Sequence, residues 1–206
     1  MKTIQPSATI ISKLDYEETL RLVELAGRVC YKSEDKIKED SAEKFIAAII
    51  KRGHESVIEH VSVTARFVVD RGVSHEIVRH RLASFSQEST RYCNYAQDKF
   101  GSELTFIKPS FYAENSLQYA SWERAMVSAE KSYFELLSLG ATPEQARAVL
   151  PNSVKTELFM TANMREWRHF FKLRTGNAAH PQMREVAEEL LSAFKQGFPV
   201  FFADLN

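Results

Sequence analysis

The sequence lacks an excess of charge of either sign, because 27 lysine and arginine residues balance 27 aspartate and glutamate residues among 206 positions. A general binder of nucleic acid or of a membrane surface carries a field of one sign. The balance therefore argues against both kinds of partner. It also means that any local cluster of one charge is a feature of that segment and not of the composition.

Cysteine is scarce, and the two that occur, Cys30 and Cys93, form no CxxC or Cys/His ligand pattern. Structural disulfides are rare in the cytosol. We expect two reduced thiols in a cytoplasmic protein, with Cys93 as a small packed thiol. The histidines are scattered along the sequence, so we expect no metal site.

Long apolar runs, low-complexity linkers and internal repeats are also lacking. No stretch approaches the length of a membrane span, and the segment from Met1 to Pro6 has no signal-peptide core. A chain of this size buries a substantial core. We expect one domain over residues 1–206, with no membrane partner.

Periodicity and capping residues predict helices in most of the chain. We expect a helix over about 15–31, with Leu22, Leu25, Ala26 and Val29 on its buried face, and a second helix from Asp40, with Glu43 three residues on, to Gly53. Others are expected from the cap Asp70 through Arg79, over about 114–139, from the capping box at Thr142, from the cap Asn163, and from Pro181 to near Gly197.

Alternating apolar residues predict strands over 61–69, 104–107 and 154–160, and the hydroxyl-rich run from Ala83 to Asp98 is expected to be a loop. Trp167, Phe170 and Phe171 are expected to form a core stripe, and Trp122 and Tyr133 to be core. Arg168 and Lys172 are expected to be solvated. The fold class is α+β: helix-rich, around a small, mainly antiparallel sheet.

Residues 79–91 hold three arginines and a histidine with four hydroxyl side chains and one carboxylate, Glu88. Guanidinium groups stay charged and bind phosphate or carboxylate through two parallel hydrogen bonds. The segment therefore predicts an anion site. The alternative is that these arginines pair with glutamates on a solvated surface, and the candidates are Glu55, Glu59, Glu76 and Glu88.

Four blocks, in order, resemble the flavin-dependent thymidylate synthases. Arg79-His80-Arg81 followed by seven residues and Ser89 is similar to that family's RHR-x7-S signature. The segments that resemble its other blocks run over 54–60, 146–151 and 163–174, and His180 with Gln182 resembles the family's next segment. The resemblance spans roughly residues 54–182.

This resemblance implies reductive methylation of dUMP to dTMP. The carbon donor would be 5,10-methylenetetrahydrofolate, and NADPH would supply the reducing equivalents through bound FAD. It also implies a homotetramer whose active sites lie at subunit interfaces, and a reaction without a cysteine nucleophile on the enzyme.

Matched by position, the resemblance also implies site residues. The implied FAD contacts are Ser56, Arg79, His80, Arg81, Gln87, Asn163, Arg165 and His169. The implied dUMP contacts are Glu76, Arg79, Gln87, Glu88, Ser89, Thr90, Arg91, Arg147 and Arg174. Arg91, Arg147 and Ser89 would hold the phosphate, and Arg174 is the implied catalytic residue, which favours the ionised form of the uracil at N3.

Other interpretations stay open at this point. Ser89 has no evident adjacent base and is better interpreted as a contact than as a nucleophile. His54 and His60 fit a core or structural role as well as a role in the site. The chain carries Glu76 where the family often has glutamine, and Ser86 where some members have asparagine. The rival functions are a nucleotide or single-stranded nucleic-acid binder and an interaction module whose arginines meet acidic residues of a partner subunit.

Overall fold

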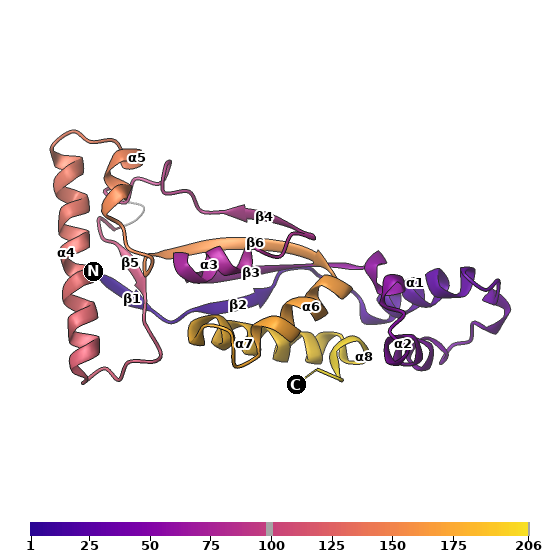
Figure 1. Ribbon diagram of the computed structural model, residues 1–206. Coiled ribbons are helices and arrows are strands. Elements are labelled where there is room, and N and C mark those ends of the chain that lie inside the picture. Colours follow the sequence, from indigo (N-terminus) through magenta and orange to yellow (C-terminus); the bar gives the residue numbers. More distant parts are fainter. Residues whose placement is uncertain (98–100, 206) are drawn as a thin grey trace.

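The computed structural model describes residues 1–97 and 101–205, and it places a sheet between two helical ends of an elongated molecule (Figure 1). The strands are β1 (Lys2–Ile4), β2 (Ser7–Ile10), β3 (Ser62–Asp70), β4 (Ala83–Gln87), β5 (Thr105–Ile107) and β6 (Lys155–Asn163). The helices are α1 (Tyr16–Val29), α2 (Ala42–Lys51), α3 (Arg71–Ile77), α4 (Leu117–Ser138), α5 (Pro143–Ala146), α6 (Met164–Arg174), α7 (Pro181–Gly197) and α8 (Pro199–Phe202), with the 3₁₀ turns η1 (Glu34–Lys36), η2 (Glu55–His60) and η4 (Arg147–Val149).

The main sheet has the order β2-β3-β6-β4 and is antiparallel throughout. Its two long central strands pair from Ser62 with Asn163 to Asp70 with Lys155. Both strands alternate buried and partly exposed residues, as the sequence predicted for one-sided burial. A separate parallel pair, β1 and β5, lies beside α4 (Figure 1). The predicted α+β class is confirmed.

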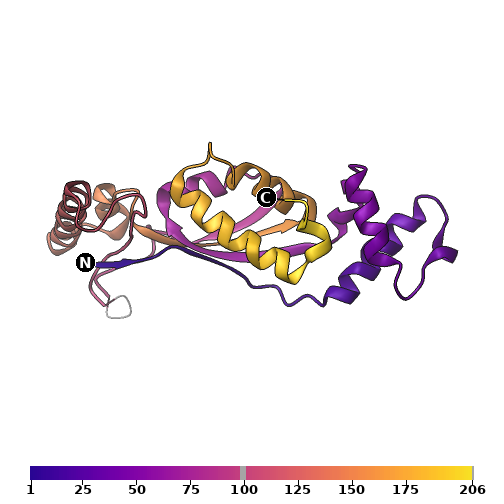
Figure 2. The same cartoon turned by 90° about the horizontal axis from the view of Figure 1, so that it is seen from below.

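Helices α6, α7 and α8 lie side by side on one face of the sheet, as Figure 2 shows from below. The predicted stripe of Trp167, Phe170 and Phe171 is fully buried there. Trp167 also donates its indole N–H to the carbonyl of Val63 on β3, at 3.0 Å. Helix α6 is thus attached to the central strand β3 both by packing and by a hydrogen bond. The start of α6 is therefore held in a fixed position at the end of the two central strands.

Most predicted caps are confirmed. Asp70 accepts a hydrogen bond from the backbone N–H of Val73, Asn163 accepts one from Glu166, and Thr142 forms a full capping box with Gln145. These caps of α3 and α6, Asp70 and Asn163, are the last residues of β3 and β6, so the two strands lead directly into α3, which precedes the arginine-rich turn, and into α6, which carries Arg174. Tyr133 is buried in a second core beneath α4, and Trp122 packs against it, as expected.

Two predictions about the first helices are wrong. In α1 the residues that face inward are Leu20, Val23 and Gly27, whereas the predicted face of Leu22, Leu25, Ala26 and Val29 is mostly exposed. Apolar residues occupy both sides of this helix, and Gly27 decides between them: a Cβ there would lie 2.5 Å from the ring of Phe45 on α2. Close approach to α2 therefore selects the glycine side.

The second error concerns Asp40, which caps no helix. Helix α2 begins at Ala42 after Ser41, and the Asp40 carboxylate instead pairs with Lys44 at 2.9 Å. Helix α3 also ends at Ile77, two residues earlier than predicted.

Among the described residues, no helix combines the length and hydropathy that crossing a membrane requires.

The predicted loop from Ala83 is wrong in its first part, where Ala83–Gln87 forms the edge strand β4 on β6. Its polar sequence has little strand propensity, and the pairing with β6 overrides it. The end of that predicted loop, Asp98, lies outside the described residues. Strands β1 and β2, the 3₁₀ turn η2 and helix α8 were not predicted.

Candidate active site

The segment Arg79-His80-Arg81 forms the turn between α3 and β4. His80 points inward and is only 4% exposed, whereas the flanking Arg79 and Arg81 are exposed. In the part of the chain that the structure describes, neither flanking guanidinium group has a hydrogen-bond or ion-pair partner. The turn therefore presents two unpaired guanidinium groups to solvent, with a buried imidazole between them.

Among the described residues, Arg79 and Arg81 pair with none of the four candidate glutamates, whereas Arg91 pairs with another exposed glutamate, Glu144. The four candidate carboxylates are each bound to another cation: Glu55 to Arg168, Glu59 to Arg165, Glu76 to Arg174 and Glu88 to Lys155. The positive charge of Arg79 and Arg81 thus stays available to an external anion.

A cavity of about 780 Å³ opens beside this turn, between η2 and the start of α6. Its lining residues are Glu55, Glu59, Leu82, Asn163, Arg165, Glu166, His169 and Lys172. Three residues of the predicted cofactor set, Asn163, Arg165 and His169, line it. Ser56, a fourth, is exposed and follows Glu55 in the chain. The structure therefore gathers residues from three distant segments at one cavity.

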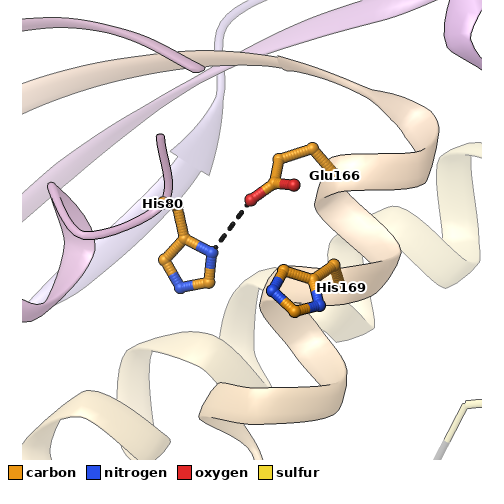
Figure 3. Close-up of side chains that lie close together, drawn as sticks. All are labelled: His80, Glu166 and His169. Carbon is orange, nitrogen blue, oxygen red and sulfur yellow. Dashed lines mark hydrogen bonds and ion pairs between the residues drawn. The ribbon is translucent and has the colours of Figure 1, made fainter. Parts of the chain in front are cut away.

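His80 lies beside two residues of α6 that line this cavity, Glu166 and His169 (Figure 3). Its Nδ1 lies 3.1 Å from a carboxylate oxygen of Glu166, and its Nε2 accepts a hydrogen bond from Nε of Arg174 at 3.0 Å. The His169 ring lies 5.7 Å away, edge-on. Burial lowers the pKa of His80; Glu166 opposes that shift, and the neighbouring Arg174 and His169 add to it. His80 is therefore neutral at pH 7.

The scattered positions of the histidines in the sequence did not indicate this group. His80, Glu166 and His169 offer ligand atoms that all lie within 4.8 Å of one another. That spacing is one that a metal ion can use. Both ring nitrogens of His80 are already engaged, however, one by Glu166 and one by a guanidinium N–H. A cation here would first have to displace Arg174.

Arg174, the predicted catalytic residue, is held on all three of its nitrogens. Besides the contact with His80, Nη1 donates to the carboxylate of Glu76 at 2.9 Å and Nη2 to the Glu76 carbonyl at 3.0 Å. Glu76 is the position at which the sequence departs from the family pattern. An ionised carboxylate accepts hydrogen bonds and cannot donate them, and here it accepts one from this arginine.

The remaining predicted substrate residues lie at the far end of β4. The Gln87 amide donates to the hydroxyls of Ser74 and Thr156, and Glu88 accepts from Lys155 and Tyr95. Thr90 is buried. These contacts lie inside the protein, so they order the strand end and the loop that follows it.

Two exposed arginines stand at this far end. Arg91 lies 3.6 Å from Glu144 of α5, which places α5 beside the loop after β4, and Arg147 follows on η4 and is exposed. Ser89 accepts from the backbone N–H of Arg91 at 3.3 Å. An anion at this end would therefore compete with Glu144 for Arg91.

Within one chain the structure does not bring the two sets of residues into one pocket. The cofactor residues other than Gln87 lie where β4 begins at Ala83, whereas Gln87, which belongs to both predicted sets, and Arg91 lie at and beyond its other end. Five strand residues span about 13 Å at roughly 3.3 Å per residue. Arg174, bound to both α3 and the turn before β4, lies on the cofactor side.

Arg168 was predicted to be a solvated helix charge, and this is wrong. It is 1% exposed and is bound by Glu55, by both carboxylate oxygens of Asp204, and by the carbonyl of Phe201. Burial alone would lower its pKa, but these carboxylates raise it overall. Arg168 thus joins η2, α6 and the C-terminal segment.

His54 and His60 are both exposed and so are not core residues. Cys93 is partly buried against the second core, as expected.

Comparison with known proteins shows which family this chain is similar to. A family profile described as "Thymidylate synthase complementing protein" matches residues 12–200. A flavin-dependent thymidylate synthase of Pyrococcus furiosus is 36% identical over 82% of this chain and 69% of its own length. One of Geobacter sulfurreducens is 35% identical, over 88% of this chain and 80% of its own length.

The fold is also similar to that of solved structures. PolB, a UMP/dUMP methylase of Streptomyces cacaoi bound with 5-Br dUMP, superimposes with a TM-score of 0.81 at 26% identity, over 98% of this chain and 96% of that one. The same methylase bound with 5-Br UMP gives a TM-score of 0.79 at 24% identity, which supports the fold alone.

The family profile and the named relatives thus identify the chain as a flavin-dependent enzyme. The chain belongs to the flavin-dependent thymidylate synthase family, and the resemblance drawn from its four motifs is confirmed.

Proposed function

We propose that this enzyme converts dUMP to dTMP by reductive methylation, with 5,10-methylenetetrahydrofolate as carbon donor and NADPH as reductant through bound FAD. The observation that carries the proposal is the arrangement around His80. Two arginines without a partner among the described residues flank it, a cavity adjoins it, and a fully restrained Arg174 is bonded to it. The family and the similarity to a dUMP methylase support the same reaction.

The residues at the cavity fit a flavin nucleotide. A cavity of about 780 Å³ lies within the range of roughly 300–1,000 Å³ that is usual for cofactors and small ligands. Arg79 and Arg81 supply positive charge that no described residue neutralises, which suits a pyrophosphate. Asn163, Arg165, His169 and Ser56 complete the proposed set at the cavity, with His80 behind them, and the last proposed contact, Gln87, lies at the other end of β4. When bound, the flavin supplies hydride transfer.

The residues proposed for dUMP divide by charge. Arg91 and Arg147, with Ser89, bind the dianionic phosphate, while Thr90, Gln87, Glu88 and Arg79 shape the nucleotide pocket. Arg174 lies where negative charge develops on the uracil and stabilises the form ionised at N3. Such a preorganised cation acts without reorganisation during the reaction. Glu76 fixes that arginine from the opposite side.

We propose that the active enzyme is a cytoplasmic homotetramer with shared sites. Arg91 and Arg147 lie at one end of β4, and the cavity lies at the other end. One chain therefore does not surround both the substrate and the cofactor. A second copy whose phosphate-binding end faces the cavity of the first completes the site.

The direct test is a turnover assay with purified protein. dUMP, 5,10-methylenetetrahydrofolate, NADPH and FAD together should yield dTMP, and omission of any one of them should abolish the product. Product formation without FAD would overturn the flavin-dependent proposal. Salt-sensitive binding to single-stranded nucleic acid, with no dTMP formed under any condition, would favour the rival binding function.

A further inference from the structure

We infer that Glu166 is a positioning residue for the reaction: through His80 it fixes the orientation of the Arg174 guanidinium that meets dUMP. The inference rests on the proposed function and adds to it a residue outside the motif positions assigned to cofactor or substrate. Figure 3 shows its first link, the Glu166 carboxylate directed at His80.

The first step is the unusual direction of the Glu166 side chain. A glutamate at the third position of a helix ordinarily reaches back to the backbone N–H of the capping residue. Here Asn163 caps α6 and accepts from the Glu166 N–H, but the Glu166 carboxylate turns to His80 instead. It is only 6% exposed. A buried carboxylate is costly without a donor, so its bond to the imidazole is the contact that compensates its burial.

The second step is the tautomer of His80. A guanidinium nitrogen donates hydrogen bonds and never accepts them. Since Nε of Arg174 lies 3.0 Å from Nε2 of His80, that ring nitrogen carries a lone pair and no proton. The imidazole proton is therefore on Nδ1, where Glu166 accepts it. Glu166 thus selects the one neutral tautomer that can bind Arg174.

The third step is that both ends of this series of contacts belong to the same helix. Glu166 and Arg174 both belong to α6, and His80 bridges them from the turn after α3. Glu76 of α3 holds the other edge of the guanidinium. The plane of the guanidinium is therefore set by two residues from outside α6, and Glu166 controls one of them.

This arrangement makes the arginine sensitive to protonation of His80. A proton on Nε2 would face the Arg174 N–H, which removes the bond and places two cations together. The charged and titratable groups around His80 are Glu166, His169 and Arg174 on α6, and Glu76 on α3 lies beyond Arg174. Of these, the two carboxylates favour the protonated form and the other two oppose it.

The test measures dUMP affinity of the flavin-loaded enzyme as a function of pH, from the change of the visible flavin spectrum on titration with dUMP. In Glu166→Gln the amide oxygen still accepts from Nδ1, but the negative charge is gone. We expect affinity above pH 7.5 within about twofold of the native enzyme. The acidic fall in affinity should move to lower pH by about one unit, because an adjacent opposite charge shifts a pKa by roughly 1–3 units.

Two further variants sharpen the comparison. Glu166→Leu removes the acceptor, so dUMP affinity should fall about tenfold at every pH, the scale of one lost hydrogen bond. Glu188→Gln on α7, an exposed position that pairs only loosely with Arg184 at 4.0 Å, removes one charge and should leave the profile unchanged. The phosphate of dUMP titrates in the same range in every variant, so only differences between variants report on His80.

Superimposable profiles for native and Glu166→Gln enzyme, or a shift toward higher pH, would overturn the inference. Retained flavin confirms that each variant is folded; should Glu166→Leu lose it, the Glu166→Gln profile alone decides. An absence of any dUMP-induced change in the native enzyme at any pH is a different outcome, because it rejects the proposed function itself.

Discussion

Two kinds of arginine occupy neighbouring parts of this molecule. Arg168 and Arg174 on α6 are bound on several nitrogens by carboxylates, a carbonyl or an imidazole. Arg79 and Arg81, on the turn that carries His80, are exposed and have no such partner among residues 1–97 and 101–205. The sequence alone does not separate the two kinds, because all four lie within motifs rich in charge.

The difference shows what each kind can contribute. A guanidinium that is already bonded has a fixed position, so it can organise the fold or present charge in one direction. An unpaired exposed guanidinium retains its bonding capacity for an external phosphate. We therefore expect the paired arginines to affect stability or turnover, and the unpaired arginines to affect ligand affinity.

The largest effect is expected for Arg168→Ala. The substitution leaves Glu55 and Asp204 without their shared cation and opens a space in the interior. Breaking a buried ion pair costs about 3–5 kcal/mol, and we expect a loss near the lower end because Asp204 is half exposed. Urea unfolding measures it. Lys172→Ala on the same helix, whose partner Glu55 lies 3.6 Å away at the surface, should cost less than about 1 kcal/mol. Equal losses in the two variants would contradict the distinction.

Arg174→Ala should keep the flavin and lose turnover. Removing one preorganised charge contact lowers kcat by about 10²–10³-fold, and the cavity that we assign to the flavin is lined by other residues. Steady-state turnover with saturating dUMP, together with the flavin content of the purified variant, checks both parts. Normal turnover would remove Arg174 from the catalytic role.

Arg81→Ala should weaken flavin retention without changing the fold. A charge-assisted hydrogen bond contributes about 1.5–3 kcal/mol, so FAD affinity should fall by about 10- to 100-fold. The free energy of unfolding of the flavin-free protein should change by less than about 0.5 kcal/mol, since Arg81 is exposed. A clear loss of stability with unaltered FAD affinity would place Arg81 among the structural arginines.

The smallest effect is expected at Asp204. Arg168 holds the pKa of this carboxyl below its ordinary value. Its contribution to stability is therefore complete above the unfolded pKa of about 3.9 and is lost as the pH falls through the folded value. Asp204→Asn should cost about 1 kcal/mol at pH 7, and the difference from the native protein should disappear near about pH 2. A difference that persists in acid would show that the carboxylate charge is not the cause.

Local signals accounted for much of the fold. Asp70, Thr142 and Asn163 each cap a helix at the predicted place, because a capping side chain acts within three residues. The alternation in β3 and β6 likewise reports one-sided burial directly. Motif spacing then located the arginine-rich turn and Arg174, although the separation of both from Arg91 along β4 required the sheet register.

The features that sequence did not indicate depend on distant neighbours. Strand β4 forms because β6 offers it a pairing edge, in spite of its serine and glutamine content. The inward face of α1 depends on how closely Phe45 approaches Gly27. His80 and Glu166, separated by 86 positions, meet only in the folded chain. Arg168 appeared to be solvated because its partners, Glu55 and Asp204, are just as remote along the sequence.

The visible absorption spectrum of the purified protein tests the central claim most directly. FAD is added, excess is removed, and the spectrum is recorded before and after dUMP. We predict a retained flavin band that shifts with dUMP, because we propose that the cavity beside His80 and the restrained Arg174 belong to one site for cofactor and nucleotide. Loss of the flavin on removal of excess FAD, or a retained band that dUMP leaves unchanged, would contradict that account.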